Sequence, residues 1–492
     1  MVYQEFMRPL YNSITKAAAM GALWNYITFA GSKGLVFITT VILARVLAPE
    51  DFGLMALGLL AVNYLSKLND LGIGAALIYR QEDVEQTADT AFFLSVGMGL
   101  ILSLAVFLSA PLIAGFFREP RVLPLLHILS MTFVISGLGN IHEVRLRKEL
   151  DFRRRLIPQI SQRFFKGAVS ITLAISGFGV WSLVWGQMAG TLAAAILFWW
   201  IYPWRPSLRF DLDAARMIVS YGLQVGLFRI LHVLYKNIDY LIIGRRMDAL
   251  QLGFYTMAFQ LPHLLIYSIQ MVVGQAVFPA YAKLQNDRNA LKRAFLTTFK
   301  YVSVFCVPVG LGIFFVAPEF VDVFYTEKWA NTVPVMQVLA ICSVINSLSA
   351  NADHVYKAVG RPDIANRIGL VRVVLTVPVI WIAAGYHILY VGVAQIALAL
   401  LNAVLQFVVA SRIISVRPSV LLMTLQPAAI ASIIMLAGIF VLHLQIASFE
   451  PLPRLIILTG WGVLLYVSAL WLMDKDIFHQ VRAIFRKEEN VL

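Results

Sequence analysis

Eight basic residues lie within apolar stretches of the sequence, where a charged side chain is energetically costly. On insertion scales a cation at the centre of a membrane helix costs about 3 kcal/mol, so eight facing lipid would cost on the order of 24 kcal/mol. We therefore expect these side chains to line a hydrated lumen that binds an anionic substrate, or to pair with one another or with acids. The eight residues are Lys33, Lys67, Arg163, Lys166, Arg229, Lys236, Lys300 and Arg372.

Polar residues recur on shared helix faces within the same stretches. Positions three, four and seven apart lie on one side of a helix, so residues at these spacings form a stripe. Such stripes at corresponding places favour two helical bundles that face one central lumen. The stripes are Arg229, His232, Lys236 and Asp239 in one stretch, Asn63, Lys67 and Asp70 in a second, and His263, Tyr267 and Gln270 in a third.

Some of these residues have a structural alternative to substrate binding. Lys236 and Lys67 each precede an aspartate by three residues, so both pairs are spaced as ion pairs within one helix. Arg163 and Lys166 lie near a basic loop toward which long side chains snorkel. For His232 and His263, hydrogen-bonded packing is the alternative to a lumen position.

Two smaller sets are the first candidates for contacts with a substrate or an ion. Arg229, Lys33 and Arg372 have no obvious acid within one helical turn, so they are the first candidates for an anionic group. Asp70 and Asp239 are candidates for binding a proton or Na⁺. No metal site, catalytic residue or cofactor is expected, and an energy source is sought in the membrane potential or in an H⁺ or Na⁺ gradient.

The composition places these charges in an integral membrane protein. Hydrophobic residues make up 60% of the 492 residues and charged residues only 14%, against roughly 25% charged residues in soluble globular proteins. Apolar stretches of about 20 residues are long enough to cross a bilayer as helices. The net charge of +13 is therefore interpreted as basic loops on the cytoplasmic side and not as a nucleic-acid surface.

Hydropathy and turn residues predict fourteen transmembrane helices and no strands. Their centres fall near residues 30, 65, 100, 133, 165, 190, 230, 265, 304, 344, 374, 400, 432 and 464. With the N-terminus inside, the inner segments carry about 25 basic residues and the outer segments about 7, which puts both termini in the cytoplasm by the positive-inside rule. No loop exceeds roughly twenty residues, which leaves no room for a separate soluble catalytic domain. The short loops also argue against a polysaccharide polymerase or ligase, which would need a large outer loop bearing catalytic Arg or His.

An internal repeat divides the chain. The phrase "LARVLAPEDFG" from residue 43 is matched by "IGRRMDALQLG" from residue 243, and "APLIAGFFREP" from residue 110 by "APEFVDVFYTE" from residue 317. Six helices per repeat predict two lobes related by a pseudo-two-fold axis along the membrane normal. The expected parts are residues 1–210, residues 211–412, two further helices over 413–474 and a cytoplasmic tail at 475–492.

Glycines and arginines of these phrases have expected roles. Gly53 and Gly253 would permit helix entry after each repeated turn, and Arg45 and Arg245 would cap the turns or lie at the membrane interface. "GQMAG" at residues 186–190 and "GLQVG" at residues 222–226 are GxxxG patterns, which indicate close helix packing. The chain has no Walker A motif, so it is not expected to hydrolyse ATP.

The phrases "LARVLAPEDFGLMAL", "NDLGIGAALIYR" and "EKWANTVPVMQVLA" resemble the polysaccharide transporters, with Wzx-type flippases and colanic-acid exporters nearest in kind. These polysaccharide transporters belong to the superfamily that also contains drug-extruding MATE proteins and lipid II flippases. The resemblance implies a flippase of the bacterial inner membrane that moves an undecaprenyl-diphosphate-linked oligosaccharide outward. It also implies that the helices over residues 413–474 form an apolar groove for the lipid tail.

Other functions and partners remain open at this stage. A MATE-type antiporter for drugs or small solutes is the alternative, although the first helix has Lys33 where MATE proteins carry an acidic residue. Expected partners are the lipid-linked oligosaccharide, membrane lipids and the polymerase and chain-length machinery, with no nucleic acid. A monomer is expected.

Overall fold

The computed structural model describes residues 31–69, 73, 74, 77, 84–220, 237–475 and 477, with the backbone alone at 67–69 and 84. All regular structure in these residues is helical. The chain divides into two compact units, Met1–Gly253 and Phe254–Leu492. The all-helical fold predicted from composition is confirmed within the described residues.

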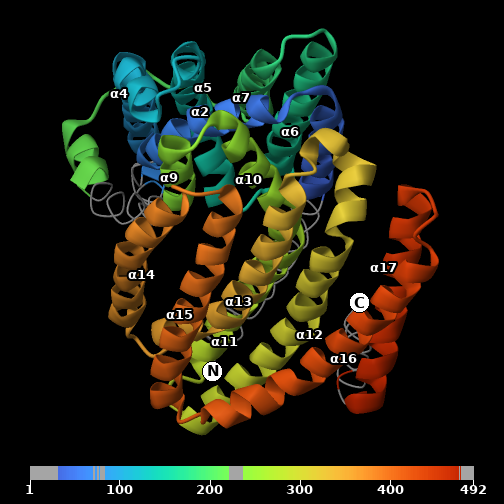
Figure 1. The fold of residues 1–492 in the computed structure, drawn as a ribbon. Coiled ribbons are helices and arrows are strands. Elements are labelled where there is room, and N and C mark those ends of the chain that lie inside the picture. Colours follow the sequence, from blue (N-terminus) through green and yellow to red (C-terminus); the bar gives the residue numbers. More distant parts are fainter. Residues whose placement is uncertain are drawn as a thin grey trace. The chain divides into compact units, whose positions relative to one another are not determined.

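The first unit consists of helices, and short turns join α4, α5, α6 and α7 (Figure 1). A helix over residues 31–46 is followed by α2 (Pro49–Asn69), α4 (Val84–Phe117), α5 (Val122–Lys148), α6 (Phe152–Ile175), α7 (Val180–Ile201) and the short α9 (Ile238–Arg246). The tightest helix pairs are α6 with α7 and α4 with α5. These pairs position the basic residues of α6.

The second unit continues the same pattern. It contains most of α10 (Ala249–Pro262), the π-helical turn η1 (His263–Tyr267), α11 (Ser268–Lys283), α12 (Arg288–Phe320), the π-helical turn η2 (Val321–Tyr325) and the 3₁₀ turn η3 (Glu327–Trp329). These are followed by α13 (Thr332–Ala358), α14 (Pro362–Ala383), α15 (Ile388–Ile414), α16 (Pro418–Gln445) and α17 (Pro451–Met473). The last two helices, coloured orange-red and red in Figure 1, pack against each other and against α12.

Ten helical segments of the described chain are long and apolar enough to cross a membrane. They coincide with the predicted third, fourth, sixth and eighth to fourteenth spans. The helix over residues 31–46, α2 and α6 lie at the predicted first, second and fifth positions, and most of the predicted seventh span falls outside the described residues. The protein is therefore a multi-pass membrane protein, while the count of fourteen stays a prediction.

The helix bounds repeat along the chain. The bounds of α5 and α13 differ by 210 at each end (332 − 122 and 358 − 148), and both helices have 27 residues. Each is preceded by a helical segment that ends before a non-glycine residue with positive φ, Arg118 after α4 and Thr326 after η2. The predicted lobe boundary at residue 210 stays a prediction, because compactness divides the described chain at a different place.

Candidate functional site

Three of the eight predicted cations lie together in the first unit. Lys33 is on the helix over residues 31–46, and Arg163 and Lys166 are one turn apart on α6. The Arg163 guanidinium is close enough to repel the ammonium groups of both lysines. Lys33 and Lys166 are half-buried, and Arg163 is exposed. We call these three residues the cationic cluster; an anionic ligand placed there would relieve their mutual repulsion.

Small residues hold α6 tightly against both of its neighbours. A Cβ atom added to Gly167 of α6 would lie 2.5 Å from the Thr39 hydroxyl on the first helix. A Cβ atom on Gly190 of α7 would lie 2.5 Å from the carbonyl oxygen of Gln162. Gly186 approaches α6 just as closely, so the close packing predicted for "GQMAG" is confirmed. The cationic cluster is therefore on a helix that larger side chains would displace.

Lys300, in the second unit, has an acidic partner that the sequence reasoning missed. Its ammonium lies 2.5 Å from the Asp474 carboxylate, which follows α17. The Lys300 side chain is 27% exposed and the Asp474 side chain 14% exposed. Arg372, the other predicted cation of this unit, is half-buried on α14.

Breaking the Lys300 ion pair is expected to destabilise the protein. In Lys300→Ala, the largely buried Asp474 carboxylate loses its counter-charge, and removal of one partner of such a pair costs about 3 kcal/mol. The melting temperature of the purified protein should fall, and the exchanged pair Lys300→Asp with Asp474→Lys should recover most of it. If Lys300 also contacts the substrate, the exchanged pair will recover stability but not transport.

The predicted acidic and amide residues are placed as follows. Asp239 is 9% exposed at the start of α9, where its Oδ1 accepts a hydrogen bond from the Tyr240 N–H at 3.0 Å. Its charge also lies near the phenol of Tyr64 on α2. Asn63, on the same helix, is exposed, and its backbone carbonyl accepts a hydrogen bond from Ser66 at 3.0 Å.

His263 begins a break in regular helix geometry. It is the first residue of the π-helical turn η1 and follows Pro262, which has no N–H to donate within the helix. Its ring stacks on Tyr267 with centroids 4.6 Å apart and an interplanar angle of 16°, and Phe259 lies 5.8 Å away. Single π turns occur frequently at functional positions. The rings of His263 and Tyr267, which were predicted to share a polar face, thus stack on each other within one turn.

Five predicted site residues lie outside the described residues or have no described side chain. In the part of the chain that the structure describes, no group of three histidine, cysteine, aspartate or glutamate side chains could hold a metal ion. Because the structure does not describe the side chains of these five residues, their roles stay predictions. The five residues are Lys67, Asp70, Arg229, His232 and Lys236.

The helices that follow the two repeated turns contact each other at their glycines. Gly53 is the fifth residue of α2 and Gly253 the fifth residue of α10, so both lie inside helices. A Cβ atom on Gly53 would lie 1.7 Å from the Ala249 carbonyl oxygen, and one on Gly253 would lie 1.9 Å from the Pro49 carbonyl oxygen. The expectation that these glycines permit helix entry was therefore wrong, because their hydrogens make room for a reciprocal backbone contact.

An aspartate accepts a capping hydrogen bond at each of these turns. Asp51 accepts a hydrogen bond from the Ala48 N–H at 3.0 Å, and Asp248 accepts one from the Gln251 N–H at 2.8 Å. Side-chain acceptors of this kind satisfy the free donors at a helix start. Arg245 instead lies over the ring of Phe116, 5.5 Å from its centroid.

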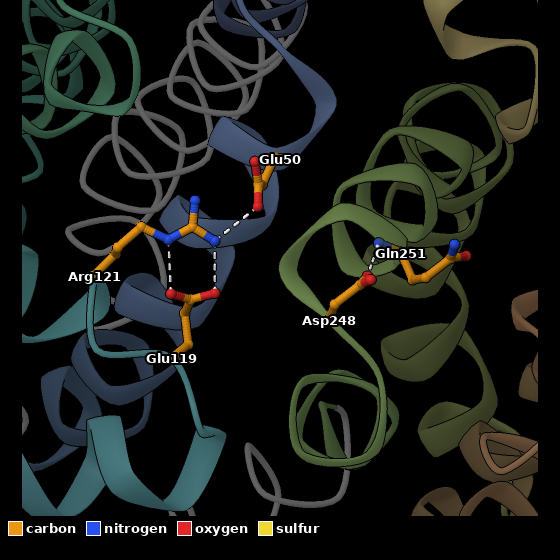
Figure 2. A network of polar contacts seen from close by, with 5 residues as sticks. All are labelled: Glu50, Glu119, Arg121, Asp248 and Gln251. Carbon is orange, nitrogen blue, oxygen red and sulfur yellow. Dashed lines mark hydrogen bonds and ion pairs between the residues drawn. The ribbon is translucent and has the colours of Figure 1, made fainter.

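A forked ion pair ties the α4–α5 connection to the start of α2. Arg121 donates from Nε and Nη2 to the two carboxylate oxygens of Glu119, both at 2.8 Å, and from Nη2 to Glu50 at 2.7 Å. Figure 2 shows this fork and the Asp248 cap. The hydrogen bonds from Arg121 hold the pKa of Glu119 below its ordinary value of 4.5.

Acid is expected to remove the stabilisation that Arg121 contributes. Because the folded-state pKa of Glu119 is depressed, this contribution is complete above about pH 4.5 and is lost as the pH falls through the lower folded-state value. The Arg121 side chain is half exposed, so the contribution is below about 1 kcal/mol. The melting temperatures of wild type and Arg121→Gln should differ at about pH 7 and converge at about pH 3. A constant difference would contradict this assignment.

Comparison with known proteins identifies a sequence family and relatives to which this chain is similar. The sequence profile described as "Polysaccharide biosynthesis protein" matches residues 42–334. The teichuronic acid biosynthesis protein TuaB of Bacillus subtilis (strain 168) is 28% identical over 359 residues, covering 72% of this chain and 74% of that protein. The lipopolysaccharide biosynthesis protein WzxC of Escherichia coli (strain K12) is 27% identical over 376 residues, covering 75% of both chains.

A solved structure shares the fold. The lipid II flippase MurJ in an inward closed conformation superposes with a TM-score of 0.75, covering 93% of this chain and 100% of that chain. At 14% sequence identity this similarity concerns the fold alone. The fold predicted from the resemblance to the lipid II flippase and MATE superfamily is thereby confirmed.

Proposed function

The chain belongs to the polysaccharide biosynthesis protein family, and we propose that it is a flippase for an undecaprenyl-diphosphate-linked oligosaccharide. In this proposal the oligosaccharide is a repeat unit of an exopolysaccharide or O-antigen. It crosses from the inner to the outer leaflet of the bacterial cytoplasmic membrane. The relatives named for teichuronic acid and lipopolysaccharide biosynthesis support this substrate class. The protein is a transporter and not an enzyme.

The cationic cluster is the observation that carries the proposal. The positive charges of Lys33, Arg163 and Lys166 lie near one another on two closely packed helices of a membrane protein. A diphosphate brings about two negative charges, and at about 7 Å and an effective dielectric of about 20 each cation gains roughly 2.4 kcal/mol per unit charge. Such gains offset the desolvation of a diphosphate, which no apolar lumen could accept.

The lipid tail requires a different surface. Helices α16 and α17 expose large apolar side chains along their length, among them Leu422, Met423, Ile433, Leu444, Ile456 and Leu472. A polyprenyl chain can remain against such a surface in the lipid while the diphosphate and sugars enter the lumen. Rocking of residues 1–210 against residues 211–412 would then expose the lumen to the outer side, with both termini staying in the cytoplasm.

The membrane potential is the proposed energy source. Moving about two negative charges outward, down an inside-negative potential, supplies roughly 4.6 kcal/mol per 100 mV. Flipping by purified protein in liposomes should therefore accelerate when an inside-negative potential is imposed. Equal rates with and without the potential would remove this idea and favour coupling to H⁺ or Na⁺ through Asp70 or Asp239.

The decisive experiment is reconstitution with a labelled lipid-linked oligosaccharide. Liposomes containing the protein should move the label between leaflets, whereas protein-free liposomes should not. A protein that moves no lipid-linked oligosaccharide but confers resistance to cationic drugs would be the MATE-type antiporter instead. In cells, polymer export that survives Lys33→Ala, Arg229→Ala and Arg372→Ala at normal expression would reject those three residues as substrate contacts.

A further inference from the structure

The second unit contains a cavity of about 460 Å³ beside the apolar surface of α16 and α17. It lies near the ends of α12 and α16 and the starts of α13 and α17. Four of its lining residues are aromatic or proline, and the other four are polar or charged. The lining residues are Phe314, Phe315, Pro318, Glu319, Gln337, Phe440, His443 and Arg454.

A buried carboxylate is the main polar feature of the cavity. Glu319 is 2% exposed, and its Oε1 lies 3.3 Å from both the Arg454 Nε and the His443 Nδ1. Its Oε2 is buried and has no hydrogen-bond partner. An unsatisfied buried polar atom is costly, and more so when it is charged. The cavity therefore presents an acceptor that requires a donor from a ligand.

The backbone carbonyl of Phe314 in the wall is satisfied within the protein, whereas His443 Nδ1 and Arg454 Nε contact the Glu319 carboxylate at 3.3 Å without a hydrogen bond. Pro318 has no N–H, so the carbonyl of Phe314, four residues earlier, lacks its usual helical donor. The Gln337 side chain supplies that donor at 2.9 Å. Arg454 also donates from Nη1 to the Ala447 carbonyl at 3.2 Å. Among the wall atoms without a hydrogen-bond partner, Glu319 Oε2 is the anionic acceptor, so it would select a ligand that carries a donor.

We propose that this cavity binds the headgroup of a zwitterionic phospholipid that carries a primary ammonium. The ammonium would donate to Glu319 Oε2, beside the rings of Phe314 and Phe440 that favour a cation. The lipid phosphate would then face Arg454 and His443. A lone anion would meet the carboxylate oxygen, and a quaternary ammonium has no N–H to donate to it.

The surroundings of the cavity suit a lipid more than a soluble ligand. Glu319 is the penultimate residue of α12, and Arg454 is the fourth residue of α17, so both lie near the ends of membrane-spanning helices. The neighbouring surface of α16 and α17 is apolar, with Phe440 53%, Leu444 64% and Ile456 63% exposed. Acyl chains can lie on this surface while the headgroup enters the cavity. This inference does not depend on which substrate is flipped.

Native mass spectrometry of the full-length protein tests the proposal. The protein is exposed to equal amounts of phosphatidylethanolamine and phosphatidylcholine with identical acyl chains, which differ in the methylation of the ammonium. Wild type should retain at least about five times more phosphatidylethanolamine, corresponding to about 1 kcal/mol. Equal retention of the two lipids by wild type would overturn the proposal without any variant.

Variants locate the site. Glu319→Gln should abolish the preference, whereas Glu327→Gln, at an exposed glutamate eight residues later, should keep it. Phe440→Ala, at a half-exposed wall residue, should reduce the preference and provides a second variant if Glu319→Gln does not fold. Persistence of the preference in both variants would refute the site. Free phosphoethanolamine should not displace the lipid, and displacement by it would show a soluble-headgroup site instead.

Discussion

Alanine at Gly53 is expected to abolish most polymer export. The added Cβ would lie 1.7 Å from the Ala249 carbonyl oxygen, and both partners are backbone atoms of helices, so no side-chain rotation relieves the overlap. Overpacking costs about 1–3 kcal/mol, and here it falls on the contact between Gly53 of α2 and the first residues of α10. Export in a complementation assay should fall at least about tenfold. Gly253→Ala should have the same effect, because the contact is reciprocal.

A matched control separates this contact from general loss of helix flexibility. Gly97, inside α4, has open space where its Cβ would be, so Gly97→Ala should export normally. All three variants should reach the membrane in similar amounts, measured by immunoblot. If Gly53→Ala exports as well as Gly97→Ala, then the close contact of Gly53 with Ala249 is not needed for transport.

Removal of the Arg163 charge is expected to slow flipping about 50-fold. This factor corresponds to the roughly 2.4 kcal/mol that one cation gains with a unit negative charge at about 7 Å and an effective dielectric of about 20. Arg163 lies beside both lysines of the cationic cluster, so its loss weakens the shared positive field. Arg163→Lys retains the charge and should retain most of the activity. Initial rates in reconstituted liposomes measure the effect.

The control for this prediction is a cation outside the cluster. Arg367, on α14, has a side chain that is 80% exposed and is 3.9 Å from Asp363. Arg367→Ala should flip at close to the wild-type rate. Lys33→Ala and Lys166→Ala should each be slower than wild type. A normal rate for Arg163→Ala would show that the substrate does not use the cluster.

Much of the fold could be predicted because bilayer crossing leaves a strong sequence pattern. Ten described helices coincide with predicted spans, since a continuous apolar run of sufficient length has few other stable structures in a membrane. The helix over residues 31–46 and α6 carry Lys33, Arg163 and Lys166, which dilute that pattern. Hydropathy therefore predicts best those helices that carry few charged side chains.

Pairing between distant helices could not be predicted from local spacing. Lys300 finds Asp474, and Glu319 finds His443 and Arg454, through contacts of α12 with the last two helices. A stripe analysis compares residues within one turn or two and cannot identify such partners. One available signal was overlooked: an acid within the apolar run "FFVAPEF" is itself a mark of a functional or paired residue.

The repeated turn illustrates the same limit. The match between "LARVLAPEDFG" and "IGRRMDALQLG" correctly identified equivalent positions, with Gly53 and Gly253 at the fifth residue of α2 and α10. It contained no information that the two copies meet, because sequence similarity reports common ancestry and not contact. The reason for two glycines became visible only in the distance from each to the other copy's backbone.

The hydrogen bond from Gln337 to the Phe314 carbonyl has a mechanical consequence. It completes a helical ladder in α12 with a donor that belongs to α13. If the two helices slid past each other by one residue, that carbonyl would be left without its donor, at a cost of about 1–3 kcal/mol. The bond therefore locks their axial register, and we expect α12 and α13 to travel as one rigid body through the transport cycle.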